Sequence, residues 1–306
     1  MMAAEKAKRK RRFGDRKDAF LVRDADPMHV FMSYMIVNRA DNEAVLNETL
    51  DITRVNEFLA KKNENNPEFK YTLFHFTCAA LAKTIQMRPW LNRFYANYKL
   101  YERYDITFSF TLKKKFVDSS KEVLVRMTYD TESDISPVDQ FNNKVKQVAT
   151  KARETDDSGS DAMDKIGFLA KIPGPILKIV AKVMHWLDRH GKMPKSACDA
   201  DPYYTTAFVT NLGSINMNAD YHHLGNWGTN SLFCVINTKK KRPFFNDDGT
   251  YEMRDSLEVG LTIDERIADG VYFAKSLKVL RHFFEHPEDL DKPASFIPEI
   301  DLTIRH

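Results

Sequence analysis

The sequence contains few of the residues that would place the protein in several large classes. Its 306 residues include three cysteines, Cys78, Cys198 and Cys234, which lie far apart and show no CxxC spacing. We therefore expect no zinc site, and we expect a reducing compartment, the cytoplasm. No apolar run reaches the roughly 18 residues of a membrane-spanning helix. The basic N-terminus is not followed by an apolar segment, so we expect no secretory signal.

Several catalytic and nucleotide-binding motifs are missing as well. The sequence has no GxGxxG, no P-loop, no GxSxG and no HExxH, and we find no internal repeat. The net charge is only +3, so the chain as a whole has no nucleic-acid signature. With 43% hydrophobic and 29% charged residues, the composition is that of an ordinary globular protein with a substantial core.

What the sequence does contain begins with a basic arm, residues 1–17, which carries eight lysines or arginines. Such a run is compatible with a nucleic-acid or anionic-surface contact. No aromatic stacking platform of the kind that single-strand binders use accompanies the run, so we favour a solvated tail with one arginine used internally. We expect the main domain over residues 18–290 and a C-terminal tail over 291–306.

A second unusual segment follows Pro173-Gly174-Pro175. Apolar residues recur there at helical spacing between 176 and 187, with Lys178, Lys182 and Arg189 off the apolar stripe. A basic amphipathic helix of this kind can lie on a membrane surface. Packing on the same protein or on a partner subunit is the alternative that we favour.

Local patterns predict the other elements. The apolar run 28–37 has strand propensity, and Pro137 is placed to open a helix. We expect helices over 54–62, 72–87, 138–153 and 270–285, and strands over 97–100, 106–113, 123–129, 204–210, 231–237, 242–245 and 252–263.

The stretch 256–274 joins a strand to a helix through a charged turn. Leu257, Val259, Leu261 and Ile263 alternate, so they should share one face of a strand. Asp269 is a good N-cap for the helix that follows. The turn itself, residues 264–270, is dense in charged residues. Taken alone, it predicts a capped turn held by an internal ion pair.

An ordered set of motifs resembles the catalytic domain of the dihydrolipoamide acyltransferases of 2-oxo acid dehydrogenase complexes, and its relative chloramphenicol acetyltransferase. The resemblance covers roughly residues 13–290. Its pieces, in order, are Leu50-Asp51-Ile52-Thr53, Met87-Arg88-Pro89-Trp90-Leu91-Asn92, Thr210-Asn211-Leu212-Gly213, Lys240-Lys241-Arg242-Pro243 with Asp248-Gly249, and the stretch 256–274.

The resemblance implies a two-layer α/β sandwich with a mixed β-sheet, assembled as a homotrimer with active sites at subunit interfaces. Coenzyme A would enter from one side and the acceptor from the other. The family signature is His-x-x-x-Asp-Gly. Its histidine is the general base, its aspartate forms a structural ion pair with an arginine near the N-terminus, and a hydroxyl before the Asn/Ser-Leu-Gly turn binds the oxyanion.

Mapped onto this chain, the resemblance assigns Asp269-Gly270 to the signature and Thr210 to the oxyanion position, where its O–H can donate. Arg12 or Arg16 would pair with Asp269. The base position, however, holds Glu265. A carboxylate with an ordinary pKa of about 4.3 is a poor base for a thiol whose pKa is about 8.5. Burial at an interface, however, raises the pKa of carboxyl groups.

Two other candidate bases, His222 and His223, follow the Asn-Leu-Gly turn, in a segment that lies near the acceptor side in the family. His75 is more consistent with a packing role. The resemblance therefore implies acyl-CoA-dependent transfer to an unknown small acceptor, without a covalently bound cofactor and without lipoyl or subunit-binding domains. Because the signature histidine is replaced, a catalytically inactive binding or assembly protein is the alternative.

Overall fold

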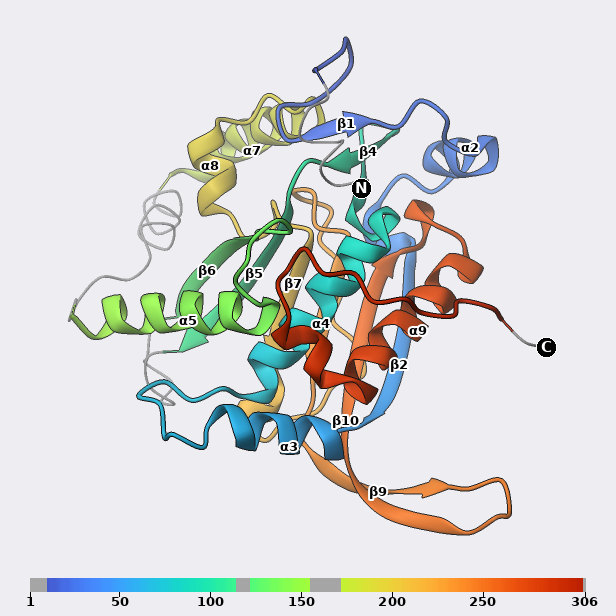
Figure 1. Ribbon diagram of the computed structural model, residues 1–306. Coiled ribbons are helices and arrows are strands. Elements are labelled where there is room, and N and C mark those ends of the chain that lie inside the picture. Colours follow the sequence, from blue (N-terminus) through green and yellow to red (C-terminus); the bar gives the residue numbers. More distant parts are fainter. Residues whose placement is uncertain (1–9, 114–121, 155–171, 305–306) are drawn as a thin grey trace.

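The computed structural model describes residues 10–113, 122–154 and 172–304 (Figure 1). Its central sheet has the strand order β2-β10-β8-β7-β5-β6, with β9 beside β10. The strands are β2 (Glu43–Asp51), β5 (Ile106–Lys113), β6 (Glu122–Tyr129), β7 (Ala207–Asn211), β8 (Leu232–Ile236), β9 (Lys240–Phe245) and β10 (Tyr251–Asp264). Strand β7 runs parallel to β5 and β8, whereas the other pairs are antiparallel. The sheet is therefore mixed, as predicted.

Helices cover one face of this sheet and form the main core with it (Figure 1). They are α3 (Thr53–Lys62), α4 (Leu73–Met87), α5 (Pro137–Glu154) and α9 (Gly270–Glu285). The four alternating residues of β10 point into this core, each at most 3% exposed. This confirms the predicted period-2 pattern and the two-layer α/β architecture. Because the pattern buries one complete face of the strand, it also fixes the pairing register of β10.

The opposite face of the sheet carries a smaller apolar cluster, formed by Phe208, Phe233 and Val235 under Leu224. The loop that contains Leu224 comes so close to the sheet that a Cβ at Gly260 would lie 2.0 Å from the Asp220 carbonyl oxygen. Glycine is therefore required there. The close approach holds this loop over the face on which Thr210 lies.

A second, three-stranded sheet and three further helices lie toward the top of the view in Figure 1. The sheet has the order β1-β4-β3, with β1 (Ala19–Leu21), β4 (Lys99–Arg103) and β3 (Arg93–Ala96). The helices are α2 (Pro27–Met35), α7 (Gly174–Arg189) and α8 (Lys195–Ala200). No helix within the described ranges is long and apolar enough to cross a bilayer.

The strand predicted over 28–37 is wrong, because this segment forms helix α2. The Asp26 carboxylate accepts a hydrogen bond from the Met28 backbone N–H, and Pro27 occupies the first helical turn, where its missing N–H costs nothing. The segment 97–100 is divided by a turn between β3 and β4. The other predicted helices and strands are present, with shifts of a few residues at several ends.

His75 has the packing role predicted for it. It is 3% exposed at the start of α4, where its Nδ1 accepts a hydrogen bond from the Thr72 backbone N–H at 3.1 Å. It therefore takes the place of the glutamate or glutamine in a capping box. Burial lowers the pKa of His75 from 6.5 to about 4.

The low pKa of His75 makes stability depend on pH. Between pH 6.5 and 4 the unfolded chain binds a proton that the folded chain does not, so this contribution is complete above pH 6.5 and lost as the pH falls toward 4. In the parent chain, the free energy of unfolding should fall by up to about 3 kcal/mol over this pH window. We expect His75→Gln to keep the cap and to abolish this fall. Urea unfolding at several pH values measures it, with the exposed His223→Gln as control. Identical pH dependence in His75→Gln and the parent chain would contradict this assignment.

Candidate active site

The turn after β10 is anchored by a buried ion pair. Asp264 is 0% and Arg266 is 4% exposed, and the Nε and Nη2 of Arg266 donate to the two Asp264 carboxylate oxygens at 2.8 and 2.7 Å. The remaining Nη1 donates to the carbonyl oxygens of Ile36 and Val37, both at 3.1 Å. The arginine is thus directed inward and tied to the segment after α2. The internal ion pair predicted for this turn is confirmed.

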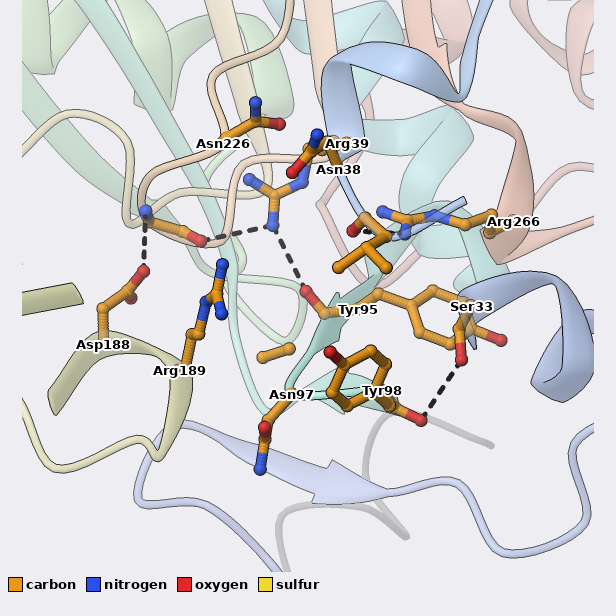
Figure 2. A pocket seen from close by; sticks show the side chains of 13 residues that line it. Ser33, Asn38, Arg39, Tyr95, Asn97, Tyr98, Asp188, Arg189, Asn226 and Arg266 are labelled. Atoms are coloured by element: carbon orange, nitrogen blue, oxygen red, sulfur yellow. Dashed lines mark hydrogen bonds between the residues drawn. The ribbon is translucent and has the colours of Figure 1, made fainter. Parts of the chain in front are cut away.

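A second buried arginine, Arg39, joins the same anchor (Figure 2). Its Nε lies 3.7 Å from Asp264, and its Nη atoms donate to the carbonyl oxygens of Gly225, Tyr95 and Gly228. Burial lowers the pKa of Arg39 and the Asp264 carboxylate opposes this change, but an arginine stays protonated in proteins. Arg39 therefore ties the turn to the loop that covers the opposite face of the sheet.

Glu265 lies between the two anchored residues of the turn, and its side chain is exposed. The Glu265 backbone N–H donates to the Asn42 carbonyl oxygen at 2.9 Å, and no described residue bonds its carboxylate. The side chain lines a groove of about 510 Å³ between α2 and α9. The other walls of the groove are mostly apolar and include Met28, Met32, Ala44, Leu46, Phe273 and Leu277.

Asp269 has a local structural role in the same groove. Its carboxylate accepts a hydrogen bond from the Tyr272 N–H at 2.7 Å and so caps α9, as predicted. The expected ion pair with an N-terminal arginine is not formed within the described part of the chain. Arg16 is buried and instead pairs with Asp18 at 2.9 Å, while the Arg12 side chain is exposed. The correction follows from β1, which places Arg16 beside α7 and the second sheet.

Thr210 lies near the end of β7, just before the 3₁₀ turn η3 (Leu212–Ile215). A Cβ at Gly213 would come within 2.6 Å of the Asn237 carbonyl oxygen, so this turn requires glycine. The Thr210 side chain is half-buried, and its hydroxyl has no hydrogen bond to any other described residue. The hydroxyl is therefore free to donate to a ligand.

The sheet register separates Thr210 from Glu265 within one chain. Thr210 pairs with Val235, and Val235 pairs with Gly260, two strands away. Glu265 follows Gly260 by five residues, directly after the end of β10 and in the direction of the β7 N-terminus. Strand rise and strand spacing then place the two residues roughly 19 Å apart. A single chain does not bring the predicted oxyanion donor and the predicted base together.

The alternative base, His222, lies closer to Thr210. Its ring stacks on Phe233, with centroids 4.2 Å apart and an angle of 6° between the planes, and it also stacks with His223, with centroids 4.7 Å apart. Phe233 pairs in register with Phe208, two residues before Thr210 on the same sheet face. Both histidines are exposed.

Sequence reasoning missed the buried anchor residues Arg39 and Tyr95. Tyr95 lies 5.0 Å below the Arg266 guanidinium and donates its hydroxyl proton to the His29 carbonyl oxygen at 2.9 Å, which holds α2 beside the turn. Neither residue belongs to a motif, and both act through positions far away in the sequence. Within the described ranges, no three histidine, cysteine or acidic side chains gather as a metal site would require.

Solved structures with a similar fold include several acetyltransferases. A probable dihydrolipoamide acetyltransferase from Listeria monocytogenes superposes with a TM-score of 0.55 at 19% identity, covering 85% of this chain and 89% of that chain. The dihydrolipoamide acetyltransferase of Azotobacter vinelandii superposes with a TM-score of 0.52 at 16% identity, covering 86% of this chain and 88% of that chain. A chloramphenicol acetyltransferase superposes with a TM-score of 0.51 at 12% identity, covering 84% of this chain and 94% of that chain.

No family model matches the sequence, and no curated protein matches it significantly. The likeness is thus one of fold, over most of the chain. The chain has the fold that dihydrolipoamide acetyltransferase cores share with chloramphenicol acetyltransferase, which confirms the resemblance predicted from the sequence.

Proposed function

We propose that this protein transfers an acyl group from coenzyme A to a small acceptor, at sites formed between copies of the chain in a homotrimer. One observation carries the proposal: the signature turn presents a free carboxylate, Glu265, to a groove, while the free hydroxyl of Thr210 lies roughly 19 Å away on another part of the same sheet. The two groups can act on one substrate only if they come from different copies.

The chemistry assigns one role to each group. Glu265 takes the proton of the acceptor hydroxyl, amine or thiol as that atom attacks the thioester carbonyl carbon. The carbonyl oxygen becomes an oxyanion, which accepts a hydrogen bond from the Thr210 hydroxyl. The intermediate then collapses, the C–S bond breaks, and the departing CoA thiolate takes the proton back from Glu265. Asp269 holds the start of α9 beside the groove but moves no proton.

Exposed apolar surfaces support assembly. On α2, Met28, Phe31 and Met35 are 64%, 58% and 65% exposed. The β9–β10 hairpin projects away from the rest of the molecule (Figure 1), and its Phe245 and Tyr251 are 72% and 60% exposed. Apolar patches of this kind on soluble proteins mark sites of association. Covering α2 with a second copy would also close the groove that holds Glu265.

The first test of the proposed function is release of free thiol from acetyl-CoA in the presence of a panel of amines, alcohols and thiols. We expect Glu265→Gln to reduce turnover by about 10²- to 10⁴-fold, and Thr210→Val by about 10²- to 10³-fold. Both replacements keep side-chain shape, so the fold should persist. Glu57→Gln on α3 changes an exposed glutamate outside the groove and the proposed assembly surfaces, so it is the matched control and should be neutral. Absence of turnover in the parent chain with every acceptor would rule the proposal out.

Mixing the two inactive variants tests the shared site. Chains of Glu265→Gln and Thr210→Val are dissociated, combined in equal amounts and reassembled. Each site needs an intact Glu265 from one chain and an intact Thr210 from another, so about a quarter of the sites regain both residues. We expect about a quarter of the parent activity to return. If each site lay within one chain, mixing would restore nothing.

Substitution of His222 tests the other candidate base. The ring stacks 4.2 Å above Phe233 on the face that carries Thr210, so a displaced base has a structural basis. If Glu265 is the base, His222→Phe should keep the stack and most of the activity. A loss of 10²-fold or more in His222→Phe, with little change in Glu265→Gln, would assign the proton transfer to the histidine.

A binding or assembly role without catalysis is the second candidate function. It is favoured by the glutamate at the position where the family signature has its histidine. Calorimetric titration with coenzyme A separates the two functions. The catalytic proposal requires measurable binding of coenzyme A to the assembled protein, whereas the assembly role predicts a defined oligomer with no heat of binding.

A further inference from the structure

We propose that helix α7 docks on an anionic lipid surface. The outward side of this helix carries Ile176, Ile179, Val183 and Trp186, which are 53%, 64%, 52% and 50% exposed. They follow one another at spacings of three and four residues, so they form one continuous stripe along the helix. The stripe belongs neither to the candidate active site nor to the core of the main sheet.

Basic side chains border this stripe on one side. At 100° per residue, Lys178, Lys182 and Arg189 share a narrow arc of the helix next to Ile179 and Trp186. All three are exposed, and none forms an ion pair with another described residue. Lys192 follows the helix and lies 4.7 Å above the Trp186 ring. Lys178, Lys182 and Lys192 can therefore contact lipid phosphates while the neighbouring apolar groups enter the acyl boundary. Arg189 also lines the pocket beside Asp188 (Figure 2).

The sequence around the helix is strongly biased toward positive charge. Residues 171–195 contain six lysines or arginines and a single acid, Asp188. That acid is 5% exposed and faces inward, where it accepts hydrogen bonds from the Tyr204 hydroxyl at 2.6 Å and the Gly228 N–H at 3.2 Å. The outward side of α7 is therefore free of negative charge over its whole length.

The helix is attached to the molecule in a way that leaves this side open. His185 packs on Trp227, with ring centroids 5.2 Å apart, and Asp188 fixes the C-terminal end. The basic arm also joins the fold here, because Arg16 donates to the Asp188 carbonyl oxygen at 3.3 Å. In Figure 1, α7 lies beside β1 at the end of the molecule opposite the β9–β10 hairpin. Two basic segments thus meet at one end.

This charge pattern favours lipid over a second copy as the occupant. A second copy of this chain would bring the same exposed lysines and arginines against the stripe, and like charges facing each other at an interface are unfavourable. A bilayer that contains phosphatidylglycerol has a negatively charged surface and an apolar interior. These two regions match the basic side chains and the apolar stripe that lie next to each other on α7. Trp186 has the amphipathic ring that is common at membrane interfaces.

Co-sedimentation of the full chain with vesicles tests the proposal. We expect binding to vesicles of phosphatidylcholine with phosphatidylglycerol at low salt, and little binding to phosphatidylcholine alone or at about 1 M salt, where the Debye length is about 3 Å. Lys178→Ala and Lys182→Ala should each weaken the partition coefficient about fivefold. Ile179→Asp should weaken it at least tenfold.

Matched controls separate the α7 face from general effects of charge and apolarity. Lys61→Ala on α3 and Ile297→Asp near the C-terminus change exposed residues outside α7 and should bind vesicles as the parent chain does. Light scattering gives the mass of every variant. The proposal is overturned if the parent chain does not bind anionic vesicles. It is also overturned if the control variants lose as much vesicle binding as the α7 variants. If the parent chain does not bind vesicles and Ile179→Asp lowers the mass of the assembled protein, the stripe is a contact between copies instead.

Discussion

The buried ion pair between Asp264 and Arg266 determines what the signature turn can do. Asp264 is completely buried at the end of β10, and its two oxygens are held by the fork of Arg266. Removal of either partner would leave a buried charge uncompensated, at a cost of about 3–5 kcal/mol. Because the residues on both sides of Glu265 point inward, the Glu265 side chain faces the groove.

The same pair extends into a network that joins distant parts of the chain. Arg39 contacts Asp264 and the carbonyl oxygen of Gly228, and the Gly228 N–H donates to Asp188 at the end of α7 (Figure 2). The turn, the loop over the opposite sheet face and the helix with the exposed apolar stripe are thus held in one geometry. Within this network the Arg39 Nε has no hydrogen-bond partner, and it contacts Asp264 only as an ion pair at 3.7 Å.

The sequence predicted those features that depend on neighbouring residues. The alternation from Leu257 to Ile263 revealed a half-buried strand because its period of two is local, and Asp269 was recognisable as a cap for the same reason. The Asp264–Arg266 pair lies within three residues, so the charged turn indicated it. The run 28–37 was misassigned because its apolar residues fit either element. The signal for a helix was the Asp26-Pro27 pair before it.

Features that depend on tertiary position could not be predicted. Arg16 pairs with Asp18 rather than Asp269 because β1 places it beside α7, a neighbour 172 residues away in the chain. Arg39 carries no motif, and its partners Tyr95, Gly225 and Gly228 lie 56, 186 and 189 residues away. The separation of Thr210 from Glu265 follows from the strand order β7-β8-β10, which no local pattern contains.

The central claim is that one site uses groups from two copies of the chain. It is tested most directly by a crystal structure of the assembled protein with coenzyme A. The account predicts that Thr210 of one copy lies about 3 Å from the position of the acyl carbonyl oxygen. Glu265 of a second copy should lie about 3 Å from the position of the attacking acceptor atom, so the two residues should be within about 8 Å of each other. A structure in which the groove at Glu265 stays open to solvent, with every Thr210 roughly 19 Å away, would contradict it.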